Sequence, residues 1–185
     1  AADVQKEIQF VLEREQLTHT LVDLQEAGKL PLRVTHNDTK LNNIMIDNAT
    51  HKGICVIDLD TVMPGLSLND FGDSIRFGAS TAAEDEQDIS KVFCDLHLFE
   101  VYVKGFLKGC GGALTDLEVE MLPMGAILMT FECGMRFLAD HLEGDHYFRI
   151  HRENQNLDRA RTQFKLVWDM EQKLSEMKAI VEKYK

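Results

Sequence analysis

The chain has 185 residues, enough for one domain or one large lobe, and 44% of them are hydrophobic, as is ordinary for a protein with a buried core. Acidic residues outnumber basic ones by 31 to 20, so the formal net charge is −11, and an acidic surface repels nucleic-acid phosphates and anionic lipid. We therefore expect no nucleic acid and no membrane as partner, whereas a neutral sugar or a cationic amine stays open as substrate.

The four cysteines, Cys55, Cys94, Cys110 and Cys133, show no C-x-x-C spacing, so neither a zinc ribbon nor a redox pair is indicated. We interpret them as free thiols in a reducing compartment. No stretch approaches the ~18 apolar residues of a membrane span, and the first residues lack the apolar segment of a signal peptide. The expected location is cytoplasmic.

A first helix is expected over residues 4–26, where apolar residues recur at helical spacing, with Gly28 at its end and Pro31 just beyond. Three segments with strand-like composition follow, at residues 32–35, 44–46 and 54–57. The polar residues 48–53 predict a hairpin turn between the last two strands, and residues 59–69 are expected to form a loop.

The rest of the chain is expected to be mostly helical, with helices over residues 70–77, 88–108, 115–142 and from 156 to the C-terminus. The stretch from Thr115 to Glu118 has the pattern of a capping box, and Gly144 follows the third of these helices as a stop signal. The predicted fold class is α+β, mainly helical, with a small β patch.

One polar segment combines the residue types that phosphoryl transfer needs: residues 36–43 read His-Asn-Asp-Thr-Lys-Leu-Asn-Asn, and a later apolar strand ends at Asp58. Transfer from ATP requires a carboxylate that orients and deprotonates the attacking hydroxyl, and oxygen ligands that hold magnesium against the phosphates. Asp38, in a polar loop, suits the base, while Asn43 and Asp58 suit the metal. The predicted cofactors are therefore Mg²⁺ and the co-substrate ATP.

This ordered set resembles the kinase pattern H-x-D-x-x-x-x-N followed by a metal aspartate. Asn37 stands where protein kinases have Arg, which makes the segment more similar to the aminoglycoside and choline phosphotransferase superfamily than to protein kinases. Four longer strings look like the N-acetylhexosamine 1-kinase branch of it, at residues 35–43, 56–65, 70–73 and 77–85. The resemblance implies the C-terminal lobe of a protein-kinase-like fold, with a β-hairpin patch carrying the catalytic loop.

The resemblance also implies a role for each matching residue. Asp38 would be the catalytic base, and Asn43 and Asp58 would bind magnesium. His36 would brace the catalytic loop without reacting, and Lys40 would meet the γ-phosphate.

On the acceptor side, the resemblance suggests that Asp60 and Thr61 contact the sugar. Arg136, Tyr147 and Trp168 are further candidates for an acceptor pocket, because arginine can fork onto hydroxyls or phosphate and aromatic faces suit sugar rings. Core packing is the competing interpretation of Trp168, and Tyr147 could instead anchor a loop.

The sequence Asp70-Phe71-Gly72 spells the D-F-G that holds metal in protein kinases. It lies 32 residues after Asp38, whereas the kinase pattern has about 20 residues between the catalytic and metal aspartates, and it follows a Pro/Gly loop instead of an apolar strand. We therefore favour Asp58 as the metal ligand and interpret Asp70 as a helix N-cap.

No glycine-rich phosphate loop precedes His36. Residues 1–185 are therefore expected to form a single kinase-like C-terminal lobe, catalytic and acceptor-binding, with the nucleotide-binding N-terminal lobe absent. Such a fragment would be inactive alone and would expose an apolar surface where the missing lobe docks. The same surface could drive formation of a homodimer.

The predicted function is transfer of the ATP γ-phosphate to a hydroxyl of a small molecule, with the anomeric hydroxyl of an N-acetylhexosamine implied by the resemblance. An aminoglycoside or amino-alcohol kinase is a second interpretation, since such cationic acceptors would want a carboxylate-lined pocket. A non-catalytic binding module is a third, and it predicts no metal binding.

Overall fold

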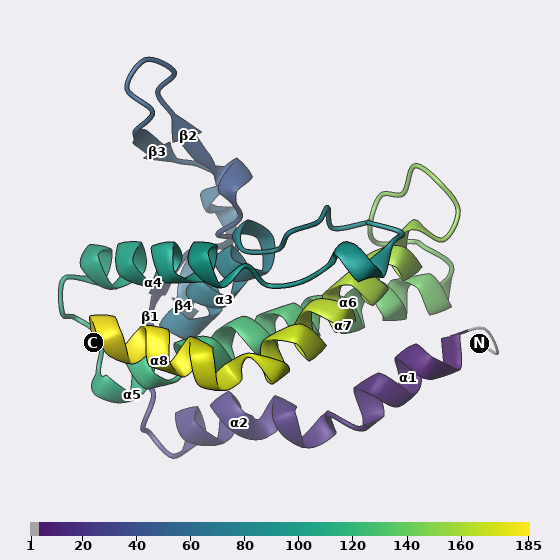
Figure 1. The fold of residues 1–185 in the computed structure, drawn as a ribbon, viewed down its shortest axis with the longest axis horizontal. Helices are drawn as coiled ribbons and strands as arrows, with labels where there is room; N and C mark the ends of the chain where they lie inside the picture. The colour runs from purple at the N-terminus through teal and green to yellow at the C-terminus, as the bar shows by residue number, and fades with distance from the viewer. Residues whose placement is uncertain (1–3) are drawn as a thin grey trace.

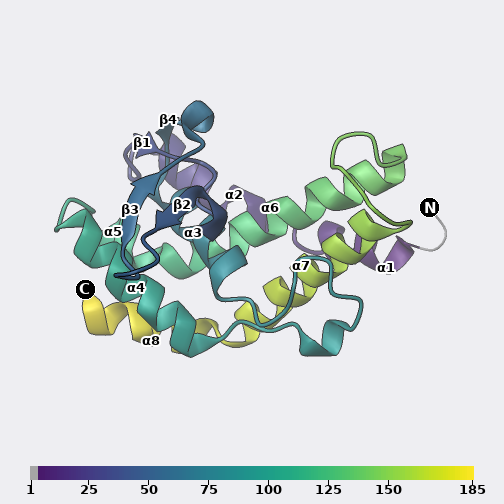
Figure 2. The same ribbon diagram turned by 90° about the horizontal axis from the view of Figure 1, so that it is seen from above.

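A long helix, α6 (Leu122–Glu143), runs through the centre of the computed structural model, which describes residues 4–185. Helices α3 (Ser67–Gly78) and α7 (Gln155–Gln172) pack most extensively against it, as Figure 2 shows. By length and composition α6 could cross a membrane, but 61% of its most apolar window is buried inside the protein. Packing in a helical core therefore accounts for its apolar surface.

Five shorter helices surround this centre: α1 (Gln5–Leu12), α2 (Glu15–Glu26), α4 (Leu96–Cys110), α5 (Asp116–Glu120) and α8 (Leu174–Tyr184). Figure 1 shows α1 and α2 along one side of the molecule and α4 beside α8 on another. Short 3₁₀ turns lie at η2 (Leu41–Asn43), η3 (Leu59–Thr61) and η4 (Ile89–Lys91). The predicted class, mainly helical α+β, is confirmed.

Two small antiparallel sheets carry the β structure. Strands β2 (Ile44–Ile46) and β3 (Gly53–Val56) form the predicted hairpin, which projects from the helical body in Figure 1. Strand β1 (Arg33–Thr35) pairs with β4 (Met63–Gly65), so the prediction of a loop over residues 59–69 is wrong at its centre. The close fit at Gly65 explains the pairing, because a Cβ there would lie 2.4 Å from Thr35 Oγ1.

Four of the expected helices are broken or shortened. The expected helix 4–26 breaks at Arg14, whose guanidinium lies 3.6 Å from the ring centre of Phe10 and pairs with Glu171 of α7 at 2.9 Å. The expected helix 115–142 breaks at Met121, after which α6 begins with Pro123 in its first turn, where a missing N–H costs nothing.

The expected helix 88–108 begins only at Leu96, because Asp95 caps α4 by accepting hydrogen bonds from the N–H groups of His97 and Leu98 at 2.8 and 3.1 Å. Before α4 the chain forms the short turn η4, and Cys94 then forms an isolated β-bridge with Ser80. The C-terminal helix divides at Lys173 into α7 and α8.

Two glycines let α3 and α6 approach closely. A Cβ on Gly72 would lie 2.3 Å from the carbonyl oxygen of Gly125, and a Cβ on Gly125 would lie 2.7 Å from the carbonyl oxygen of Leu68. Neither backbone can give way, so only glycine fits at this crossing. Helix α3 is thereby fixed against the central helix.

Glu118 joins three elements at the other end of α3. It completes the predicted capping box of α5, which is confirmed, and accepts hydrogen bonds from Arg33 of β1 at 3.0 and 2.7 Å and from Ser67 of α3 at 2.8 Å. Burial alone would raise the pKa of Glu118, but these donors together with Thr115 lower it to about 2. The start of β1, and with it the segment that follows, is therefore tied to the helices.

Candidate active site

The segment predicted to be catalytic leaves β1 and is held on the helical body by Asp70. The carboxylate of Asp70 accepts hydrogen bonds from the backbone N–H groups of His36 and Asn37, both at 2.8 Å, and its carbonyl accepts one from Thr39 Oγ1 at 2.5 Å. The interpretation of Asp70 as an N-cap is wrong, because α3 begins at Ser67 and the carboxylate serves the loop instead of its own helix. The left-handed backbone at Asn37 (φ 64°) turns the chain toward Asp38.

His36 and Thr61 connect the loop to the following strands. His36 Nδ1 accepts a hydrogen bond from the backbone N–H of Asp38 at 3.2 Å, and its Nε2 lies 3.0 Å from the carbonyl of Ile57. This pattern fits the neutral tautomer with the proton on Nε2. Thr61 Oγ1 donates to the carbonyl of His36 at 2.6 Å. Both side chains are thus used in bracing the loop.

The carboxylate of Asp38 lies between two donors. Lys40 Nζ is 2.9 Å from Oδ2, and Asn43 Nδ2 donates to the same oxygen at 2.7 Å and to the Asp38 carbonyl at 2.8 Å. Burial alone would raise the pKa of Asp38, but the hydrogen bonds from Lys40 and Asn43, followed by the charge of Lys40, hold it below its usual range. Asp38 is therefore ionised at neutral pH, as a proton acceptor must be.

Asn43 and Asp58 supply oxygens suited to magnesium. The carbonyl of Asn43 accepts from the N–H of Ile57 at 3.0 Å, which places Asp58 next along the chain beside η2. Asn43 donates through Nδ2, which leaves Oδ1 as its acceptor. The exposed side chain of Asp58 makes no hydrogen bond or ion pair within residues 4–185. Asp58 is also left-handed (φ 64°), a strained backbone that is common at functional sites.

No group of three or more His, Cys, Asp or Glu side chains that could hold a metal occurs in the described residues. Two protein oxygens agree with the habit of magnesium, which keeps waters and phosphate oxygens as its other ligands. The residues present therefore fit a Mg²⁺–nucleotide complex better than a site closed by protein ligands.

A cavity of about 620 Å³ opens beside Asp38. Its predicted members are Asp38, Lys40, Thr61, Arg136 and Tyr147, so the structure brings these five together from the catalytic loop, η3, α6 and the loop after α6. The cavity has the size of a small-molecule site.

One wall of the cavity is aromatic and basic. The guanidinium carbon of Arg136 lies 5.8 Å from the ring centre of Tyr147 and 5.4 Å from that of Phe148. Asp140, which the sequence did not single out, accepts hydrogen bonds from the N–H groups of His146, Tyr147 and Phe148 at 2.9, 2.7 and 2.9 Å. The loop that carries Tyr147 is therefore held on α6 by Asp140, while the Tyr147 side chain is 74% exposed.

Another part of the lining is an ion-pair network that begins on α3. Arg76 pairs with Asp73 at 2.9 Å and with Glu84 at 2.7 Å, and Glu84 Oε2 lies 3.8 Å from Arg159 of α7. Asp73, Arg76 and Glu84 fall within or beside the strings that carry the family resemblance. Their spacing alone does not indicate a shared cavity wall, because Arg159 joins from the other half of the chain.

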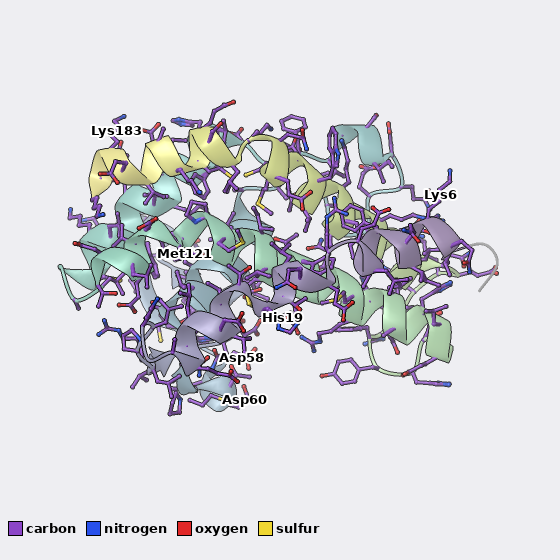
Figure 3. All side chains as sticks on the ribbon, turned by 90° about the horizontal axis from the view of Figure 1, so that it is seen from below. Lys6, His19, Asp58, Asp60, Met121 and Lys183 are labelled. Atoms are coloured by element: carbon purple, nitrogen blue, oxygen red, sulfur yellow. The ribbon has the colours of Figure 1, made fainter. Side chains whose placement is uncertain are left out.

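Two predicted acceptor residues lie elsewhere. Asp60 is exposed in η3 and does not line the cavity; Figure 3 labels it with Asp58 at the strand-bearing end of the molecule, away from Lys6. Trp168 lines a separate groove with Phe10 and Phe164, and Lys165 Nζ lies 3.8 Å from its ring centre. At 44% exposure Trp168 is neither in the acceptor cavity nor fully in the core.

A helical lobe with a projecting hairpin and a loop of this composition defines the class of kinase-like C-terminal lobes. Residues 1–96 match the model of the phosphotransferase enzyme family (APH), and the chain belongs to this family. The family is one of ATP-dependent kinases that act on small molecules. The match covers the catalytic loop, both metal-ligand candidates and α3, and it ends before Arg136 and Tyr147.

Proposed function

We propose that this chain provides the catalytic and acceptor-binding lobe of a sugar kinase that phosphorylates the anomeric hydroxyl of an N-acetylhexosamine. The observation that carries the proposal is the cavity in which the ionised Asp38 faces a wall made by Arg136 and Tyr147. The aromatic wall suits the apolar face of a sugar ring and its N-acetyl group, and Arg136 can donate to ring hydroxyls.

In this proposal Asp38 accepts the proton of the attacking hydroxyl as the new bond to the γ-phosphorus forms and the bond to the β–γ bridging oxygen breaks, releasing ADP. Lys40, which already contacts Asp38, would also reach the γ-phosphate. Asn43 Oδ1 and the Asp58 carboxylate would hold Mg²⁺, which neutralises phosphate charge when it is bound.

The charge of the cavity favours a neutral acceptor over a cationic one. The whole chain has 31 acidic against 20 basic residues, yet the cavity is lined by four acidic residues and five basic ones. The acidic members are Asp38, Asp73, Glu84 and Glu132, and the basic ones are Lys40, Arg76, Arg136, Arg149 and Arg159. An aminoglycoside or choline would gain little from such a lining.

The proposal is tested by phosphoryl transfer from MgATP, with this chain and with the longest reading frame that contains it. The acceptors are N-acetylglucosamine, N-acetylgalactosamine, an aminoglycoside and choline. We expect the longer protein to turn over an acetylated hexosamine, and Asp38→Asn in that protein to lower kcat by about 10²- to 10⁴-fold, the range of general-base catalysis.

The control is Asp23→Asn, which neutralises an exposed carboxylate on α2 and is expected to keep full activity. Preferential turnover of choline or the aminoglycoside would move the assignment to the second class of kinase. Absence of transfer by both proteins, together with no Mg²⁺ or Mn²⁺ binding in a titration, would favour a non-catalytic binding module.

A further inference from the structure

One carboxylate oxygen in the cavity wall has no partner. Both Nε and Nη2 of Arg76 donate to Asp73 Oδ1, at 3.1 and 2.9 Å. Asp73 Oδ2 is buried and receives no hydrogen bond from any residue in the range 4–185. The Asp73 side chain as a whole is 9% exposed.

This arrangement is unusual for a buried arginine–carboxylate pair. The planar guanidinium normally donates in parallel to both carboxylate oxygens, and each oxygen can accept two hydrogen bonds. Here both Nε and Nη2 donate to Oδ1, and the remaining donor group of Arg76, Nη1, donates to Glu84. A buried acceptor left without a donor is costly, so its retention calls for an explanation.

The position of Asp73 indicates which donor could arrive. Asp73 lines the same cavity as Asp38 and Arg136. It also lies near Lys40, whose pKa is raised first by its hydrogen bond to Asp38 and further by the charges of Asp58 and Asp73. The unpartnered carboxylate thus lines the same cavity as Asp38 and lies within electrostatic reach of Lys40.

We propose that Asp73 Oδ2 accepts a hydrogen bond from a second hydroxyl of the sugar, one that is not phosphorylated, and that Asp73 is therefore a specificity-determining residue. This inference rests on the function proposed above and adds a requirement to it. The acceptor must present two hydroxyls, one to Asp38 for transfer and one to Asp73 for recognition.

A neutral hydroxyl fits this position better than an ammonium group. The guanidinium of Arg76 already sits against Asp73, and a second cation beside it would meet like charge. Oδ2 is shielded from bulk water, so a hydrogen bond to it forms in a low-dielectric surrounding. Such a bond is stronger than one in water, and losing it costs more binding affinity.

The test compares the affinities of N-acetylglucosamine and its 3-deoxy, 4-deoxy and 6-deoxy analogues for this chain, measured by calorimetry without nucleotide. We expect wild type to bind one of the analogues about tenfold or more weakly than the parent sugar, since a hydrogen bond to a charged group is lost. In Asp73→Ala we expect the parent and that analogue to bind within about twofold of each other.

Glu84→Ala is the matched control. It also removes one carboxylate partner of Arg76 from the same wall, but it leaves Asp73 Oδ2 in place. It is expected to keep the wild-type preference between parent and analogue. If Asp73→Ala does not fold, Asp73→Asn replaces it, because the Asn carbonyl can still pair with Arg76 while the charge is gone. The preference is then expected to shrink severalfold.

The inference is overturned if Asp73→Ala or its replacement keeps the full wild-type preference, if Glu84→Ala loses the preference equally, or if choline binding depends on Asp73. Normal sugar turnover with an unchanged preference would remove this role of Asp73 and leave the proposed function standing. Failure of wild type to bind any of the sugars would contradict the proposed function, and this inference with it.

Discussion

The ionisation of Asp38, the proposed base, is set by its neighbours. Lys40 and Asn43 both contact one oxygen of its carboxylate, and their effect exceeds that of burial. The cost is basicity, since a carboxylate with a lower pKa holds the substrate proton less firmly. The gain is that the base stays ionised over a wide pH range.

Removing Lys40 should reverse this balance. In Lys40→Met we expect the pKa of Asp38 to rise above the wild-type value, because burial is then opposed by fewer donors. A carbon-13 NMR titration of the Asp38 carboxyl measures the shift directly. In an active protein the acid limb of the pH–rate profile would move to higher pH, because the base is protonated at a higher pH.

Lys52→Met, which removes an exposed lysine from the β2–β3 turn, is the control and should leave the pKa of Asp38 unchanged. A pKa for Asp38 in Lys40→Met equal to or below that of wild type would show that Lys40 does not set the ionisation of this carboxyl.

At the scale of elements, α3 organises the site. Its first turn holds the catalytic loop through Asp70, and its later residues Asp73 and Arg76 form a cavity wall. The crossing at Gly72 and Gly125 fixes this helix against α6, which carries Arg136. The two walls of the cavity are therefore positioned by one helix–helix contact.

Gly72→Ala should disrupt this contact. The new Cβ would meet the Gly125 backbone at 2.3 Å, so we expect a loss of at least about 3 kcal/mol in the free energy of unfolding, at the upper end of overpacking effects. Urea unfolding followed by circular dichroism measures it.

Gly105→Ala in α4 supplies the comparison, because its Cβ would have no atom within 4 Å. This second substitution should stabilise the protein by about 0.5–1 kcal/mol through helix propensity alone. Equal stability of the two variants would mean that the α3–α6 crossing has room that the backbone distances exclude.

The contrast between local and distant contacts explains what the sequence could predict. The hairpin, the capping box at Thr115 and the helix stop at Gly144 depend on residues close in the chain, and all three are present. Asp70 was misinterpreted as a cap because its partners are more than 30 residues earlier.

The same limit applies to the candidate site. The grouping of Asp38, Asn43 and Asp58 follows from one strand–loop–hairpin unit and could be anticipated from spacing. The cavity could not, because Asp73, Arg136 and Arg159 meet only when α3, α6 and α7 pack together. Trp168 has the right chemistry for a sugar but lies in a separate groove, a distinction that residue type does not make.

For the whole molecule, the prominent feature is an apolar surface on the projecting hairpin. Four of its side chains, Met45, Ile46, Ile54 and Val56, are between 49% and 63% exposed. Exposed apolar residues on a short two-stranded hairpin are typical of a surface that another protein segment covers. We propose that a nucleotide-binding lobe or, in its absence, a second copy of the chain packs there.

Self-association of the isolated chain is therefore expected to increase with concentration in sedimentation velocity. Ile54→Lys should weaken it, because a charge would have to be buried on association. Val22→Lys adds the same charge at an exposed apolar position on α2 and should have no such effect. A wild-type chain that stays monomeric at high concentration would argue against an interacting hairpin.

The anchoring of the loop by Asp70 has a consequence for how such an enzyme can change. The loop that carries Asp38 is attached to α3, which also lines the cavity, whereas the hairpin beyond η2 extends away from the helices (Figure 1). In the proposed function, the segments that would bind the nucleotide and the acceptor are therefore different parts of the chain. Under the proposed function, mutations around the hairpin can therefore change contacts to the nucleotide while the acceptor-binding side chains on the helices stay the same.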